Sequence, residues 1–193
     1  MILPSDPDLG TWNARTIIRN MFPLLIVLCS IVLIAGITLE GAEDMLREYA
    51  ILAVMVPVMV DMGGNLGAIL SSRMTSRFHL GTTTLDPRDR ILWANVAAIL
   101  ALGVTIFAGL GASAWAIGRM IGSTIPLGDL LLIAMTSGMA VAVIAVVFSL
   151  GTTYVSYRLG IDPDDTTIPI VTNVVDVLGM VIFIGISALV LDF

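Results

Sequence analysis

The chain contains no lysine, one cysteine and one histidine, and only 12% of its 193 residues are charged. The single cysteine, Cys29, excludes an intrachain disulfide framework, and the lack of further Cys and His residues excludes a Cys/His metal centre built by one chain. We expect Cys29 to be buried and His79 to be solvated in a loop. The shortage of charge excludes a soluble domain of this size, which would need many more polar residues to cover its surface.

The sequence is mainly apolar, since 58% of its residues are hydrophobic. Cutting the sequence at its charges leaves five uninterrupted or nearly uninterrupted stretches: Met21–Leu39, Tyr49–Ser72, Ile91–Gly118, Leu130–Tyr157 and Thr166–Leu191. Each reaches the roughly 20 residues that a helix needs to cross a hydrocarbon core about 30 Å thick. The sequence therefore predicts an all-α integral membrane protein with five transmembrane helices.

The arginines predict the orientation of these spans. Seven fall on one side, namely Arg15, Arg19, Arg73, Arg77, Arg88, Arg90 and Arg158, and two on the other, Arg47 and Arg119. Because positive residues are retained on the cytoplasmic side, we expect a cytoplasmic N-terminus, an outer C-terminus and a multi-pass position in the plasma membrane.

The domain organisation is simple. Residues 1–20 are expected to form a cytoplasmic leader, for which an interfacial helix is one option, and residues 21–193 one membrane domain without an appended soluble domain. The outer loop at 40–48 is too short to fold by itself. In the inner loop, Thr84 or Asp86 is a candidate cap for the third span.

Two carboxylates interrupt the spans, Asp61 in the second and Asp176 in the fifth. A charge at bilayer depth costs roughly 2.5–3.5 kcal/mol on insertion scales. Such a residue usually persists because an ion, a proton or a partner uses it. The two acids are therefore the leading candidates for a functional site.

In the second span, Asp61 and Asn65 are four residues apart and share a helix face, which Ala68 and Ser72 continue. Oxygen-bearing and small side chains along one line suit a hydrated cation. Gly63 and Gly67 on the same helix are better explained by close helix packing than by ligand binding.

In the fifth span, Thr172, Asn173 and Asp176 lie within one turn. Hydroxyl, amide and carboxylate oxygens favour Mg²⁺, Mn²⁺ or Ca²⁺ over copper or zinc. Because so few carboxylates are present, and because Mg²⁺ dehydrates reluctantly, we expect a largely hydrated ion.

Three alternatives stay open. Both acids would pair with arginines of a partner if the chain were a non-transporting subunit of a membrane complex. Methionines at helical spacing, such as Met55 with Met59, would suit Cu(I), although they also fill irregular helix contacts. Two intramembrane aspartates would suit an aspartyl peptidase only if they came within hydrogen-bonding reach.

Several stretches in order resemble the membrane domain of the MgtE magnesium transporter/channel family and of its eukaryotic solute-carrier relatives. The resemblance covers about residues 20–193. It is carried by PVMVDMGGNLG (57–67), SSR (71–73), FHLG (78–81), GIDP (160–163), PIVTNVVDVLG (169–179) and the LEG at 39–41.

This resemblance implies that Asp176 holds hydrated Mg²⁺ in a pore and that Thr172 offers a backbone carbonyl. It also implies roles for Asn65 and Glu40, and a parallel homodimer whose pore is lined by the second and fifth helices. Spacing alone leaves Glu40 equally well explained as an ordinary interfacial acid.

The chain also departs from the family pattern. Asp61 stands where bacterial members usually carry a small residue, and Ile69 where they carry glutamine. The cytosolic N-terminal and CBS domains are absent, so we expect no gating through them.

Taken together, the sequence predicts a homodimer in the lipid bilayer that transports divalent cations. Mg²⁺ is the first choice, and Mn²⁺, Co²⁺ and Ca²⁺ stay open. The sequence does not decide between a channel and a proton- or Na⁺-coupled exchanger, or the direction of flux. We expect no enzymatic activity and no nucleic-acid partner.

Overall fold

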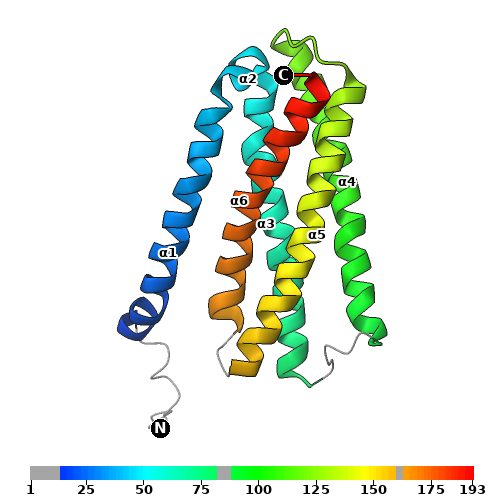
Figure 1. Cartoon of the computed structure of the whole chain (residues 1–193). Coiled ribbons are helices and arrows are strands. Elements are labelled where there is room, and N and C mark those ends of the chain that lie inside the picture. Colours follow the sequence, from blue (N-terminus) through cyan, green and yellow to red (C-terminus); the bar gives the residue numbers. More distant parts are fainter. Residues whose placement is uncertain (1–13, 82–87, 160–162) are drawn as a thin grey trace, which may run out of the picture.

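The computed structural model describes residues 14–81, 88–159 and 163–193, and in these ranges all regular structure is helical. The helices are α1 (Ala14–Gly41), α2 (Glu43–Glu48), α3 (Ala50–His79), α4 (Arg90–Met120), α5 (Leu127–Leu159) and α6 (Pro163–Leu191). Figure 1 shows five long helices running roughly side by side, with the short α2 joining α1 to α3 at one end.

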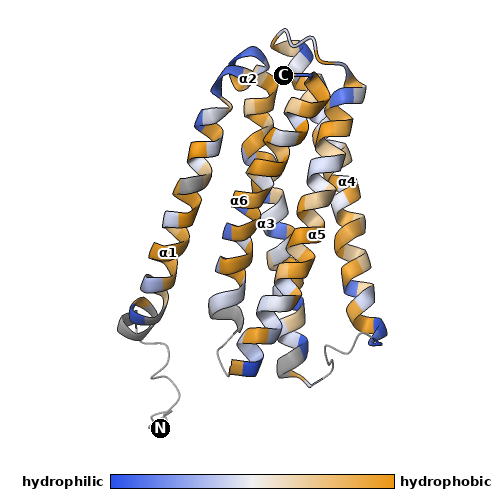
Figure 2. Cartoon of the chain, in the orientation of Figure 1, coloured by the Kyte–Doolittle hydropathy of each residue, from blue (hydrophilic) through white to orange (hydrophobic). Residues whose placement is uncertain are grey.

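The prediction of five membrane-length helices is confirmed. The helices long and apolar enough to cross a membrane cover Met21–Gly41, Ala50–Arg77, Arg90–Met120, Leu127–Leu159 and Thr166–Leu191. Figure 2 shows hydrophobic residues along most of each helix and hydrophilic ones gathered at the two ends. Hydrophilic positions also interrupt α3 and α6 about halfway along, where the two aspartates were predicted to lie.

The arginine-rich ends of the helices gather at one end of the bundle. Arg73, Arg77, Arg90 and Arg158 lie at the end where α3 and α5 finish and α4 begins. Arg47 and Arg119 lie at the opposite end, together with the C-terminus. The two groups of arginines that the sequence assigned to opposite sides of the membrane are thus separated along the bundle.

One local element was not predicted, and two local predictions were wrong. The outer loop contains a helical turn and a half, α2, whose Met45 is buried. Helix α3 continues to His79, so the backbone of this residue is helical. The cap of α4 is Asp89, whose carboxylate accepts a hydrogen bond from the amide of Ile91 at 2.8 Å, whereas Thr84 and Asp86 lie outside the described residues.

Helix α3 lies at the centre of the bundle and packs against α4, α5 and α6, while α1 packs chiefly against α6. Only 12% of the apolar window of α1 is buried, compared with 50% for α3. The core contains Met55, Met59, Phe107 and Phe183, each at most 1% exposed. Burial of Met55 and Met59 supports their packing role.

Two glycines allow α3 to approach α5 and α6. A Cβ at Gly63 would overlap the side chain of Val141 and lie 2.8 Å from Cγ1 of Val175. A Cβ at Gly67 would lie 2.5 Å from Cγ1 of Val171. Real Cβ atoms do not tolerate such distances, so the close contact of these helices requires glycine here, as small-residue packing in membranes predicts.

The neighbouring glycines Gly63 and Gly64 provide a matched test. We expect Gly63→Ala to lower the thermal midpoint of the purified protein by roughly 2–8 °C, because overpacking costs about 1–3 kcal/mol. Gly64→Ala would place its methyl in ordinary contact, at least 3.5 Å from other atoms, and should leave the midpoint nearly unchanged. Equal midpoints for the two variants, in thermal unfolding followed by tryptophan fluorescence, would contradict this packing.

Candidate metal-ion site

The α3 part of the site begins with a proline. Pro57 lies inside the helix and cannot donate a backbone hydrogen bond, one turn before Asp61. Asp61 and Asn65 lie on one face of α3, as their spacing predicted, and Nδ2 of Asn65 donates to Oδ2 of Asp61 at 3.0 Å. Both side chains are exposed on the surface of this single chain. The bond fixes one carboxylate oxygen and leaves the other for a cation or its water.

The α6 part of the site is arranged around a second proline. Oγ1 of Thr172 donates to the carbonyl oxygens of Ile168 at 3.0 Å and of Pro169 at 3.1 Å. Nδ2 of Asn173 donates to the Pro169 carbonyl at 2.7 Å. Both side chains therefore use their donors on their own helix. The oxygen atoms of Thr172 and Asn173 and the Asp176 carboxylate therefore remain free to accept hydrogen bonds from the water ligands of a hydrated metal ion.

Gly64 brings the two halves together. A Cβ at this position would lie 3.5 Å from Cγ2 of Thr172 and 3.7 Å from Oδ1 of Asp176. The Asp176 carboxylate therefore lies against a stretch of α3 that has no side chain. Asp61 lies three residues before Gly64, about one turn away on α3. The structure thus places Thr172 and Asp176 of α6 against Gly64, one turn from Asp61 on α3, a contact that sequence alone did not indicate.

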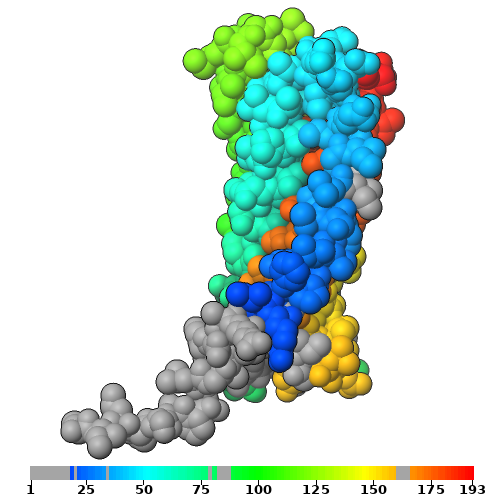
Figure 3. All heavy atoms as spheres, turned by 90° about the vertical axis from the view of Figure 1, so that its left-hand side faces the viewer, coloured from blue at the N-terminus to red at the C-terminus, as the bar shows by residue number. Residues whose placement is uncertain are grey.

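A furrow gives access to this cluster. Asn173 and Asp176 line an open groove of about 500 Å³, whose other wall is α1, with Leu25, Leu28, Cys29, Val32, Leu33 and Gly36. Figure 3 shows atoms of α6, in orange, at the bottom of a furrow between α1 and α3. Cys29 is exposed here, which corrects the expectation that it is buried. Sequence patterns gave no sign that α1 forms a wall of this site.

Glu40 is not part of the cluster. It is exposed near the end of α1, one helical turn beyond the groove-lining Gly36. A turn of helix rises about 5.4 Å. The Glu40 carboxylate therefore lies toward the end of the groove nearest α2 and not beside Asp176.

The charges around the cluster favour a cation. In the described part of the chain, neither Asp61 nor Asp176 has an arginine partner, whereas Arg47 forms an ion pair with Glu43 on α2. Nor do three or more Asp, Glu, His or Cys side chains gather anywhere among the described residues. So few direct ligands suit a metal ion that keeps most of its water, as Mg²⁺ does.

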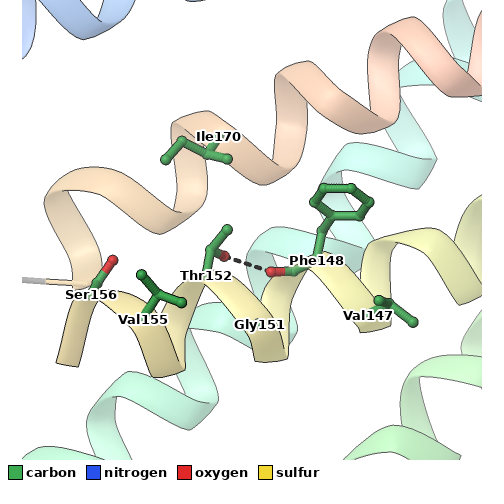
Figure 4. A pocket seen from close by; sticks show the side chains of 7 residues that line it. All are labelled: Val147, Phe148, Gly151, Thr152, Val155, Ser156 and Ile170. Carbon is green, nitrogen blue, oxygen red and sulfur yellow. Dashed lines mark hydrogen bonds between the residues drawn. The ribbon is translucent and has the colours of Figure 1, made fainter. Parts of the chain in front are cut away.

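A second groove has different chemistry. It measures about 370 Å³ and lies between α5 and α6, lined by Val147, Phe148, Gly151, Thr152, Val155, Ser156 and Ile170 (Figure 4). The Thr152 hydroxyl donates to the Phe148 carbonyl of its own helix at 2.6 Å. The other side chains that line this groove are mostly aliphatic or aromatic, and none is a carboxylate. The groove therefore suits lipid tails and not a cation.

Comparison with known proteins agrees with the chemistry of the cluster. Residues 56–186 match the sequence model of the family MgtE, described as a divalent cation transporter. This range includes Asp61, Asn65, Thr172, Asn173 and Asp176, while Glu40 lies outside it. The magnesium transporter MgtE of Thermus thermophilus is 30% identical over 168 residues, which are 87% of this chain and 36% of that protein. The chain thus spans about a third of the length of this curated relative.

The reactivity of Cys29, the one cysteine in the sequence, tests whether the groove contains water. We expect a positively charged thiol reagent to modify Cys29 in detergent-free nanodiscs, and Mg²⁺ to slow the modification several-fold, because an ion at Asp176 would repel the reagent. Mass spectrometry measures the modified fraction, with Cys29→Ser as the unreactive control. Modification by lipid-soluble reagents alone would show that lipid fills the groove.

Proposed function

The chain belongs to the MgtE family of divalent cation transporters, and from this premise we propose that it carries a hydrated divalent cation, most readily Mg²⁺, through a pore lined by α3 and α6. Asp176, Asn173 and Thr172 would hold the ion on α6. Asp61 and Asn65 would hold it on α3. The observation that carries this proposal is the approach of the Asp176 carboxylate to Gly64 on α3, one turn from Asp61.

The exposure of Asp61 supports a dimer. Asp61 lies eleven residues from the start of the span Ala50–Arg77, or about 16 Å along the helix. In a single chain this carboxylate and Asn65 would face lipid near the middle of the bilayer, at a cost of roughly 2.5–3.5 kcal/mol. A second copy related by a two-fold axis along the membrane normal would cover both furrows and enclose water between them.

The size of the groove fits a hydrated ion. Six waters occupy about 180 Å³ at roughly 30 Å³ each, while the groove on one protomer measures about 500 Å³. Two facing copies would supply two Asp176 carboxylates to one ion through its water ligands. Mg²⁺ is favoured because it keeps its waters, and Mn²⁺ is the closest competitor for oxygen ligands.

The remaining features belong to the same proposal. The end of the bundle with Arg73, Arg77, Arg90 and Arg158 faces the cytoplasm by the positive-inside rule. Glu40 lies on the outer side, where its charge raises the local concentration of cations near the groove. The membrane is the plasma membrane, and the chain works as a parallel homodimer.

Replacing the α6 carboxylate tests this function. We expect Asp176→Asn to reduce Mg²⁺ flux into proteoliposomes to the background of empty vesicles, because the neutral amide no longer attracts the hydrated ion. Size-exclusion chromatography with light scattering should still find a dimer. The matched control is Asp192→Asn, which removes a charge at the end of the chain, where the backbone φ of 52° suits asparagine. Flux like that of the unmodified protein in Asp176→Asn would contradict the site.

Replacing the α3 carboxylate should have a smaller effect. Asp61→Asn keeps an acceptor for Asn65 but removes one charge near the ion. A binding free energy that is weaker by about 1.4 kcal/mol corresponds to a tenfold higher dissociation constant for the ion. We therefore expect about a tenfold higher Mg²⁺ concentration for half-maximal flux, with the maximal flux retained. An unchanged concentration dependence would remove Asp61 from the ion path.

A further inference from the structure

Six buried hydroxyl side chains lie on the faces of α3, α5 and α6 that meet toward the arginine-rich end of the bundle. We call them the hydroxyl seam. They are Ser71, Thr75, Ser149, Thr153, Ser156 and Thr167, of which Ser156 is 6% exposed and the others at most 1%. On α3 and α5 they recur at intervals of three or four residues, which places them on one face of each helix.

Two hydrogen bonds between helices show where the seam lies along the bundle. Oγ of Ser149 donates to the carbonyl oxygen of Gly67 on α3 at 2.9 Å. About two turns further along α5, Oγ of Ser156 and Oγ1 of Thr166 on α6 share a hydrogen bond of 2.9 Å. Figure 4 shows Ser156 at the end of the α5–α6 groove. The residues between these two bonds must therefore lie between the same three helices.

The layer between the two bonds contains three hydroxyls. Ser71 lies one turn beyond Gly67 on α3, and Thr153 one turn beyond Ser149 on α5. Thr167 follows Thr166 on α6. All three side chains are fully buried. A Cβ at Gly67 would meet both Val171 of α6 and Ser149 of α5, and the three hydroxyls each lie one turn from these residues toward the arginine-rich end, so they share one level of the junction.

These three oxygens, and that of Thr75, have no hydrogen-bond partner within the described residues. Outside the seam, the buried Ser187 on α6 likewise has no partner, whereas several other helical hydroxyls donate to a carbonyl of their own helix. Thr136 donates to Leu132 at 2.6 Å, and Thr152, the neighbour of Thr153, donates to Phe148 at 2.6 Å. The seam oxygens are thus turned away from their own backbones, and a buried hydroxyl without a partner is costly.

We propose that the hydroxyl seam binds ordered water molecules at the junction of α3, α5 and α6. Water both donates and accepts, and so it can satisfy several hydroxyls at once, as buried waters in proteins commonly do with about three hydrogen bonds each. A metal ion fits less well, because the seam contains no carboxylate and an uncompensated charge within a membrane span is expensive.

This water site is separate from the proposed ion path. On α6, Thr172 lies five residues beyond Thr167, about 7.5 Å along the helix, and Asp176 nine residues beyond it, about 13 Å. Between them, Val171 and Val175 are fully buried in a small apolar cluster with Val141 and Ala145. Water in the seam therefore serves the junction of the helices, and the proposal stands whether or not the chain transports Mg²⁺.

Adjacent threonines on α5 provide the test. Thr153→Val keeps the shape of the side chain but removes the hydroxyl that would bind water. We expect it to lower the thermal midpoint by roughly 2–8 °C, whereas Thr152→Val should change the midpoint by less than about 2 °C. If no water binds, Thr153→Val removes only an unsatisfied polar atom, and the midpoint would stay the same or rise. That result would overturn the proposal.

A second variant keeps the test valid if Thr153→Val fails to fold. Ser71→Ala removes a hydroxyl of the same layer with little change in volume. We expect a similar drop, and because both residues would share the same water, the double variant should lose clearly less than the sum of the two single losses. Strictly additive losses would contradict a shared water.

Two further measurements complete the experiment, namely the thermal midpoint in different salts and a high-resolution structure of the seam. The midpoint should be the same in sodium chloride as in choline chloride, and a high-resolution structure should show density within about 3.2 Å of Oγ1 of Thr153. A sodium-dependent rise in the midpoint that Thr153→Val abolishes would overturn the proposal in favour of a cation. Side chains found bonded to their own helices, with no density between them, would overturn it as well.

Discussion

The close contact between α3 and α6 is the constraint on which the rest of the molecule depends. Gly63 and Gly67 leave room for valines of α5 and α6, and Gly64 leaves room for Thr172 and Asp176. Membrane helices gain little from excluding lipid, so close packing through small residues is a main source of their association. The same contact that holds the bundle together brings a carboxylate of α6 against bare backbone of α3, one turn from Asp61.

Helix α3 carries polar groups on two faces with different uses. Asp61 and Asn65 are exposed and bonded to each other, whereas Ser71 and Thr75 are buried among neighbouring helices. We assign the first face to a hydrated cation and the second to bound water. Carboxylates suit the cation because they offset its charge, and neutral hydroxyls suit water because they both donate and accept. The central position of α3 explains how one helix can serve both.

Much of the fold could be predicted from sequence because membrane spans are set by length and hydrophobicity alone. All five spans were found, with ends that differ from those of the structure by a few residues, the largest difference being at the end of α3. The shared helix face of Asp61 and Asn65 followed from helical spacing. The helix in the outer loop was missed, because its six residues are too few for a periodic pattern.

The site could be predicted only in part because it depends on contacts between helices. Sequence indicated which oxygens share a turn of α6, but not that Gly64 would meet Asp176 or that α1 and Cys29 would form a wall of the groove. The hydroxyl seam did leave a signal, Ser and Thr at helical spacing on α3 and α5. That signal gains meaning only when burial and missing partners are known.

The most direct measurement of the central claim is the position of a bound ion. Mn²⁺ substitutes for Mg²⁺ at oxygen sites and scatters anomalously, so crystals of the dimer grown with Mn²⁺ would locate it. The account predicts an anomalous peak between α3 and α6, about 4–5 Å from the Asp176 carboxylate because water lies between metal and oxygen. Peaks found only at surface acids such as Glu43 and Asp44, with none near Asp176, would contradict it.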